Sequence, residues 1–368
     1  MWKCGSLSKS VLLRSARKFS SRYSYSKIGS GLLLGSVLLV NEVSEEKNKP
    51  WVVEYPAAAK KNDVLLSRRI KSDMDNTGLS LRLYQYQSCP YCCKVRAFLD
   101  YYGFSYDVVE VNPLTKSQTK FAGGYKKVPV LQSSASDKPL IESSLIISVL
   151  KTYLHRKQDS LDDILAMYPE HKTVDPKSNK QIVSHPNKYF IMPEGSLNSS
   201  DELQNVREER ELREWVDNWF IHLISPNVYR TWSEALETFH YFSKVGEWER
   251  NFNTMERYLA IYVGAAFMWQ ISKMLKKRHK IDDERKAMAD AFDHFLSMKG
   301  SHRTFLGGDL PNLGDLALYG AINSFEGCTA FQEMRKETEI GKWFDDVHRA
   351  VEKKLGRSLI EKKCISSQ

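Results

Sequence analysis

The chain has 368 residues, of which 42% are apolar and 11% aromatic, which excludes a disordered protein, a collagen, a coiled coil and a disulfide-stapled mini-protein. A mean hydropathy of −0.45 excludes a polytopic membrane protein. The net charge of +9 resides mainly in residues 1–40, which hold seven basic side chains and no acidic one, so nucleic-acid binding is not expected.

The first 40 residues are expected to form a targeting leader followed by a short apolar anchor. Residues 1–27 are basic, Ser-rich and free of acidic side chains, as organelle-targeting leaders are. The apolar run 28–40 is shorter than the roughly 20 residues that span a bilayer. Its length fits the apolar core of a signal peptide, yet no clear cleavage site follows. A mitochondrial leader, a signal peptide and a marginal anchor all remain open. Residues 41–79 are polar and aperiodic, and they predict a linker.

Residues 80–155 show the order of elements that is typical of a thioredoxin-like α/β domain. Alternating apolar residues predict strands, and apolar residues three and four apart predict helices. The predicted elements are a strand over 81–86, a helix over 94–102 that ends at Gly103, a strand over 105–111, a short helix over 115–121, strands over 127–131 and 138–141, and a helix capped by Ser143 or Ser144 that runs to 154. A cysteine pair stands where the first strand meets the first helix, which completes the pattern.

Cys89 and Cys92, in the motif Cys-Pro-Tyr-Cys, predict a reactive thiol. Cys89 stands at or just before a helix start, where free backbone N–H groups and the helix dipole favour a thiolate. Lys94 and Arg96 are expected to add positive charge near Cys89. Alternatively, Arg96 faces solvent. No second Cys or His pair stands at a suitable spacing, so a zinc site is disfavoured and no metal is expected.

A second group of residues predicts a glutathione site beside this thiol. Val128-Pro129 stands where thioredoxin-like proteins place a cis proline, and the residue before such a proline can pair with a peptide-like ligand as a strand would. Glu142 can accept the amino group of the γ-glutamyl end. Ser143 and the N-terminus of the following helix can hold the carboxylate at that end.

The rest of the chain predicts a polar insertion and then an all-α domain. Residues 156–205 are polar, are interrupted by four prolines and contain one short helix near 161–168. Apolar periodicity predicts long helices within a domain over 206–360. Asn312 and Asp315 form a capping-box-like helix start, so they are expected to serve folding rather than catalysis.

Several segments resemble the membrane-associated prostaglandin E synthase type 2 family, across both domains over roughly 80–350. The segments are Leu83–Cys92, Lys94–Asp100, Val109–Pro113, Lys127–Val130, His222–Thr231 and Pro311–Ala317. The resemblance implies a glutathione-transferase-like architecture, in which a thioredoxin-like domain precedes a helical domain, and a homodimer. It also implies an enzyme that isomerises prostaglandin H2 to prostaglandin E2.

The resemblance further implies roles for individual residues. The family's catalytic residues match Tyr86 and Cys89, its second cysteine matches Cys92, and its glutathione contacts match Val128, Pro129, Glu142 and Ser143. The family has Asp where Glu142 stands, so the reach of this longer side chain is left open. In the expected mechanism a Cys89 thiolate attacks an endoperoxide oxygen while Tyr86 hydrogen-bonds to the thiol or the substrate.

Other properties follow from the resemblance alone. The family binds haem through the glutathione sulfur, and in that state it degrades prostaglandin H2 to a hydroxy fatty acid and malondialdehyde. It associates with Golgi or perinuclear membranes through the N-terminal segment and has a cleaved cytosolic form.

Two further functions remain open from the residues. Cys-Pro-Tyr-Cys is typical of glutaredoxins, in which Cys89 and Cys92 would act as nucleophile and resolving thiol. The other is a redox-sensitive, non-catalytic binding module at a membrane.

Overall fold

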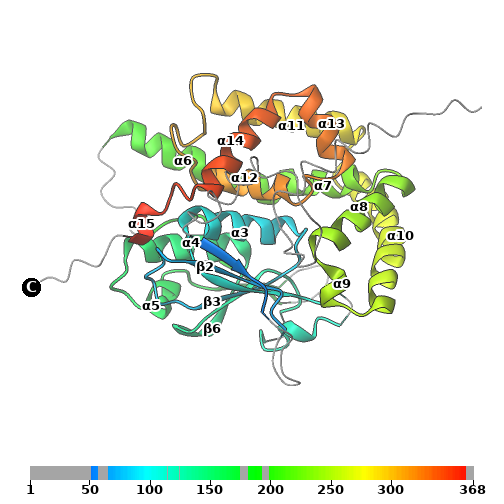
Figure 1. Ribbon diagram of the computed structural model, residues 1–368. Coiled ribbons are helices and arrows are strands. Elements are labelled where there is room, and N and C mark those ends of the chain that lie inside the picture. The colour runs from blue at the N-terminus through cyan, green and yellow to red at the C-terminus, as the bar shows by residue number, and fades with distance from the viewer. Residues whose placement is uncertain are drawn as a thin grey trace, which may run out of the picture. The chain divides into compact units, whose positions relative to one another are not determined.

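The computed structural model describes residues 51–361 except 57–64, 114, 124, 175–180 and 193–198 (Figure 1). The predicted leader and apolar anchor, residues 1–40, lie outside these ranges. Among the described residues, no helix has both the length and the apolar character needed to cross a bilayer.

A six-stranded mixed sheet forms the α/β part of the molecule. Its strands are β1 (Trp51–Glu54), β2 (Arg68–Ser72), β3 (Leu81–Gln85), β4 (Tyr106–Glu110), β5 (Val130–Ser133) and β6 (Ser136–Ile141). The spatial order is β1-β2-β4-β3-β5-β6, with β3 and β4 parallel and all other neighbours antiparallel. Helices α3 (Pro90–Tyr102) and α4 (Ser143–His155) pack against each other beside this sheet (Figure 1). The order β3-α3-β4-β5-β6-α4 confirms the predicted thioredoxin-like domain.

The prediction of a linker over 41–79 is wrong at residues 51–54 and 68–72, which form β1 and β2. These strands extend the sheet at the edge of β4. Arg69 in β2 donates to both carboxylate oxygens of Asp107 in β4, at 2.6 and 3.2 Å. Ile70 is the only apolar residue of β2, so the strand depends on pairing with residues far along the chain and shows no local alternation.

Helix α3 ends at Gly103 as predicted but begins at Pro90, four residues before the predicted stretch 94–102. Pro90 occupies the first turn, where its missing N–H leaves no helical bond unmade. Gly103 ends the helix at φ +81°, in the left-handed region that glycine adopts without a Cβ penalty. By contrast, the helix predicted over 115–121 is reduced to a 3₁₀ turn at Ser117–Thr119.

The chain then passes through a two-stranded hairpin into a helical part. The remaining elements are α5 (Leu161–Ala166), β7 (His171–Val174), β8 (Gln181–Ser184), α6 (Ser200–Trp215), a π-helical segment (Val216–Phe220), α7 (Ile221–Val228), α8 (Trp232–Val245), α9 (Trp248–Asn251), α10 (Thr254–Arg278), α11 (Glu284–Lys299), α12 (Leu313–Asn323), α13 (Thr329–Glu337), α14 (Ile340–Glu352) and α15 (Ser358–Glu361). The helical part begins at α6, earlier than the predicted boundary at 206, because Ser199 and Glu202 form a capping box at its start.

Asn312 and Asp315 cap α12 as expected for folding residues. The two side chains form a reciprocal capping box. The buried Asp315 carboxylate also accepts hydrogen bonds from three backbone N–H groups, at 3.0–3.1 Å, and from the Trp343 indole at 3.1 Å. Both oxygens of this carboxylate therefore accept hydrogen bonds within the fold, as the predicted folding role requires.

Helix α12 packs closely against α3 and so joins the helical part to the α/β part (Figure 1). A Cβ added at Gly320 would lie 2.6 Å from the Cα of Lys94. Only glycine fits at this crossing without a backbone shift, because real Cβ contacts are not that short.

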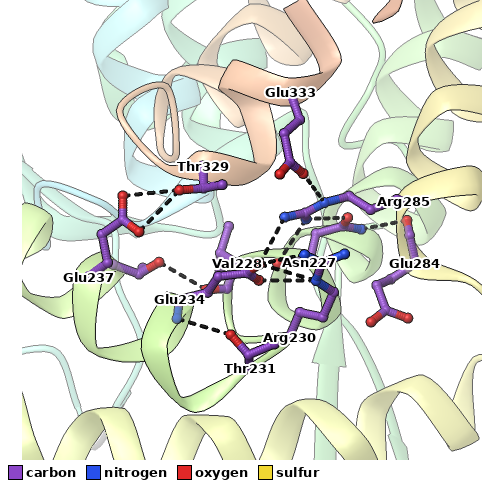
Figure 2. Close-up of polar contacts among 11 residues, drawn as sticks. Asn227, Val228, Arg230, Thr231, Glu234, Glu237, Glu284, Arg285, Thr329 and Glu333 are labelled. Atoms are coloured by element: carbon purple, nitrogen blue, oxygen red, sulfur yellow. Dashed lines mark hydrogen bonds and ion pairs between the residues drawn. The ribbon is translucent and has the colours of Figure 1, made fainter. Parts of the chain in front are cut away.

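A polar network fixes the turn between α7 and α8 (Figure 2). Arg285 of α11 donates to the backbone and side-chain oxygens of Asn227, at 3.0 and 2.9 Å, and to Glu333 of α13 at 2.6 Å. At the same turn Arg230 donates to Glu234 at 2.6 Å. Asn227 is fully buried, so these bonds hold α7 and α8 in place relative to α11 and α13.

Candidate functional site

A cavity of about 870 Å³ lies where the start of α3 meets α7, α8 and α10. The α/β part lines it with Tyr86, Gln87, Ser88, Cys89, Pro90, Tyr91, Val111, Pro113 and Lys116. The helical part lines it mainly with apolar side chains, among them Ile221, Ile224, Val228, Phe239, Val263 and Phe267. The structure thus brings the predicted catalytic residues Tyr86 and Cys89 to one wall of a large apolar cavity.

Cys89 is placed for reaction by its position at the start of α3. It is the N-cap residue, and its N–H donates to the carbonyl of Tyr86 at 3.1 Å, so one tight turn holds both residues. A hydrogen bond from the Cys92 thiol lowers the pKa of Cys89, and two backbone N–H groups and the charge of Arg96 add to this effect, while burial opposes it. Cys89 remains partly exposed, so the thiolate favoured here can reach a ligand in the cavity.

The two predicted partners of Cys89 stay protonated at neutral pH. Burial, and then the neighbouring Cys89 sulfur, raise the pKa of the fully buried Cys92 well above its ordinary value. Burial raises the pKa of Tyr86 to about 12, with smaller contributions from the two cysteines. The site therefore combines one thiol that ionises readily with two groups that retain their protons.

Arg96 does not face solvent, which corrects one of the two expectations for this residue. Its side chain is buried and donates to the Gln87 carbonyl at 2.7 Å, to the Cys93 sulfur at 3.0 Å and to the side chain of Gln85. The Glu110 carboxylate accepts from the Gln85 amide at 2.7 Å and from the Gln87 N–H at 3.1 Å. This network, which the sequence pattern did not reveal, fixes the turn just before Cys89.

Lys94 lies near Cys89 in sequence, but its charge is neutralised elsewhere, which corrects the expectation that it supports the thiolate. The fully buried ammonium forms an ion pair with Asp217 in the π-helical segment and donates to Ser144 at 3.1 Å. Burial tends to raise the pKa of Asp217, but Lys94 and Ser144 hold it below its ordinary value. Tyr189 also donates to Asp217, at 3.1 Å. Lys94 therefore joins α3 to the helical part.

The residues predicted to bind glutathione lie outside the lining of the cavity. The peptide bond between Val128 and Pro129 is cis, as expected. Glu142 has φ +73° and forms an ion pair with Lys188 at 3.3 Å. The Ser143 hydroxyl is buried and has no hydrogen-bond partner.

The prediction that Ser143 or Ser144 caps α4 is wrong. Glu142 occupies the N-cap position, without a side-chain cap. The Ser144 hydroxyl is directed instead to the Asp217 carboxylate, to which it donates at 2.5 Å. The first turn of α4 thus presents free N–H groups beside the unpartnered Ser143 hydroxyl.

Comparison with known proteins identifies the family. Residues 83–172 match the model of the glutathione S-transferase N-terminal domain. Prostaglandin E synthase 2 of Danio rerio is 39% identical over 330 residues, which cover 88% of this chain and 83% of the relative. Prostaglandin E synthase 2 of Mus musculus is 41% identical over 286 residues, which cover 75% of this chain and 72% of the relative.

A solved structure of glutathione S-transferase III in its apo form aligns with 75% of this chain and 95% of its own, at 14% identity and a TM-score of 0.41. The family assignment rests on the two prostaglandin E synthase 2 relatives and not on this structural alignment. Their alignments with this chain are long enough to include both the α/β and the helical parts. The chain belongs to the prostaglandin E synthase 2 family.

Proposed function

We propose that this protein is a prostaglandin E synthase, which isomerises prostaglandin H2 to prostaglandin E2 in the cavity that contains Tyr86 and Cys89. The observation that carries the proposal is a partly exposed thiol of lowered pKa in the wall of a large apolar cavity. A fatty-acid endoperoxide offers apolar chains to such a cavity and a weak oxygen–oxygen bond to such a thiol. The names of the two relatives support the same reaction.

The first half of the reaction opens the endoperoxide. The Cys89 thiolate attacks one of the two oxygens, which forms a sulfur–oxygen bond and breaks the oxygen–oxygen bond. The other oxygen leaves as an alkoxide and takes the phenol proton of Tyr86, so it becomes the ring hydroxyl of the product. The pKa of Tyr86, about 12, means that this proton is present at neutral pH.

The second half forms the ketone and restores the enzyme. The Tyr86 phenolate removes the proton from the carbon that carries the sulfur-bonded oxygen. The electrons of that carbon–hydrogen bond form the carbonyl, the sulfur–oxygen bond breaks, and Cys89 is released as the thiolate. Substrate and product are isomers, so the cycle consumes no oxidant or reductant.

Glutathione fits beside this site, at the start of α4. The buried Ser143 hydroxyl has no partner, and the N–H groups of the first turn are free to bind a carboxylate. The Glu142 carboxylate would bind the ammonium group of glutathione while it keeps its ion pair with Lys188. The Val128 backbone would bind the cysteinyl part of glutathione. Glutathione supplies a second thiol when bound. Calorimetric titration with glutathione should give at least ~10-fold weaker binding for Glu142→Gln and little change for the exposed Asp137→Asn.

Thiol–disulfide exchange is the second candidate function, because the Cys92 thiol donates directly to Cys89. Reduction of a glutathione mixed disulfide, lost in Cys89→Ser, would support it. The binding of haem through the glutathione sulfur, and the degradation of prostaglandin H2 in that state, stay predictions. A haem absorption band that depends on glutathione would support the binding.

The proposal includes a homodimer and attachment to a membrane through the N-terminal segment. Four large apolar side chains of α10 are exposed and lie outside the lining of the cavity, which supports contact with a second copy: Met255, Tyr258, Tyr262 and Met274. Fractionation of cells that express the full chain would show where the protein is located. It would distinguish Golgi or perinuclear membranes from mitochondria and would detect a cleaved cytosolic form.

The function is tested by incubating the purified protein with prostaglandin H2 and quantifying prostaglandin E2 by mass spectrometry against the uncatalysed background. Wild type should exceed that background, and Tyr86→Phe should lose about 10²-fold or more in rate. Tyr84→Phe is the matched control, because the Tyr84 hydroxyl donates to Gln132 and Tyr84 does not line the cavity. A wild-type rate equal to the background would refute the proposal.

A further inference from the structure

Lys116 is the only lysine, arginine, aspartate or glutamate that lines the cavity in the described part of the chain. The other polar groups there are neutral at neutral pH or belong to the Cys89 site. His222 also lines the cavity, and burial followed by the nearby charges of His279 and Arg278 lowers its pKa, which favours the neutral ring. The cavity therefore has one fixed positive charge among mainly apolar walls.

The backbone of Lys116 holds this side chain in an unusual conformation. Its φ of +49° and ψ of +30° lie in the left-handed region, which non-glycine residues rarely adopt. Its N–H donates to the Asn112 carbonyl at 2.9 Å, and its own carbonyl accepts from the Thr119 N–H at 3.2 Å. The turn is thereby pinned at both ends, so the position of Lys116 is set by the loop after β4.

The ammonium of Lys116 has a hydrogen bond but no counter-ion. Its Nζ donates to the Lys126 carbonyl at 3.1 Å, and no described carboxylate forms an ion pair with it. A half-buried lysine whose one hydrogen bond goes to a neutral carbonyl has further N–H donors for an anionic group. A long-chain carboxylic acid matches this arrangement, because its chain suits the apolar walls and its head group suits the single cation.

We propose that Lys116 binds the free carboxylate of the lipid substrate and so selects fatty acids over their neutral esters. This inference rests on the proposed function and adds a specificity residue to it. The carboxylate of glutathione is the competing ligand, yet Val128, Glu142 and Ser143 do not line the cavity, whereas Lys116 shares it with apolar side chains of α7, α8 and α10. Lys116 thereby fixes one end of the lipid in the cavity.

The test is equilibrium dialysis of arachidonic acid and its methyl ester against the full-length protein. Wild type should bind the acid about 10-fold tighter than the ester, which is the lower end of what one hydrogen bond between charged groups contributes. Lys116→Met should lose this preference by weakening the acid alone, and Lys116→Arg should keep it. Lys120→Met is the matched control, because Lys120 is exposed on the same loop and does not line the cavity.

Two results would overturn the inference. One is an acid preference that survives in Lys116→Met or is missing in wild type. The other is that Lys116→Met leaves lipid binding unchanged but weakens the binding of glutathione. If the variant also binds the glycyl ethyl ester of glutathione as tightly as wild type does, Lys116 is assigned to the glycyl carboxylate of glutathione. Because binding is measured without turnover, an acid preference in a protein that forms no prostaglandin E2 would refute the proposed function while supporting this inference.

Discussion

Replacing Cys92 with alanine should raise the pKa of Cys89 and slow every reaction of its thiolate. Of the groups that lower the pKa of Cys89, the Cys92 thiol makes the largest contribution. Alanine at position 92 removes this hydrogen-bond donor. Hydrogen bonds to charged groups contribute about 1.5–3 kcal/mol. Since one pKa unit corresponds to about 1.4 kcal/mol, the pKa of Cys89 should rise by about 1–2 units.

The assay is the rate of alkylation of Cys89 by iodoacetamide as a function of pH, followed by mass spectrometry of the peptide that contains it. The thiolate is the reacting form, so the rate rises as the pH passes upward through the pKa. The wild-type curve should rise below the range of an ordinary cysteine, and the Cys92→Ala curve should lie about 1–2 units higher.

Two variants separate the hydrogen bond from other effects of the substitution. Cys92→Ser keeps a donor in the same place, so its curve should lie nearer to that of wild type. Cys328→Ala removes another buried thiol, at the start of α13, and should leave the curve unchanged. An alkylation curve for Cys92→Ala that coincides with wild type would show that the reasoning about this thiol pair is wrong.

Three further predictions concern stability and assembly. Asp217→Ala leaves the buried Lys94 unpaired and should lower the free energy of unfolding in urea by about 3–5 kcal/mol. The double variant Lys94→Met, Asp217→Leu should recover most of this stability. Equal losses of stability in the two variants would contradict the importance of the ion pair. Gly320→Ala should lose about 1–3 kcal/mol, while Gly341→Ala, whose Cβ would meet its nearest neighbour at 3.5 Å, should not be destabilised; thermal unfolding of both variants decides this. Tyr262→Glu, at an exposed position of α10 outside the cavity lining, should convert the proposed homodimer to a monomer in sedimentation velocity, and an unchanged dimer would place the interface elsewhere.

The sequence predicts those parts of the fold that local signals determine. The strand before Cys89 and the glycine at the end of α3 act within a few residues, and the structure confirms both. The capping box of α12 is equally local, and its role in folding is also confirmed. Local patterns therefore sufficed for the thioredoxin-like order of elements and for the position of the Cys89 thiol.

Long-range pairing accounts for what the sequence did not predict. β2 pairs with β4 and is joined to it by the Arg69–Asp107 ion pair, and Lys94 is neutralised by Asp217, which lies 123 residues later. A charged residue in a helix looks the same in sequence whether it faces solvent or a buried partner, so the role of Arg96 could not be distinguished either. Lys116 also lacked a sequence signal, because only the folded loop places it in the cavity wall.

The most direct test of the account is the rate at which Cys89→Ser converts prostaglandin H2 to prostaglandin E2. The protein and substrate conditions should be those of wild type, with Cys328→Ser as the control for a serine at another cysteine. We expect a Cys89→Ser rate at the uncatalysed background and a Cys328→Ser rate close to wild type, because Cys89 is the one cysteine among the described residues that lines the cavity, and its pKa is lowered. A Cys89→Ser variant with the full wild-type rate would contradict the central claim that this thiolate opens the endoperoxide.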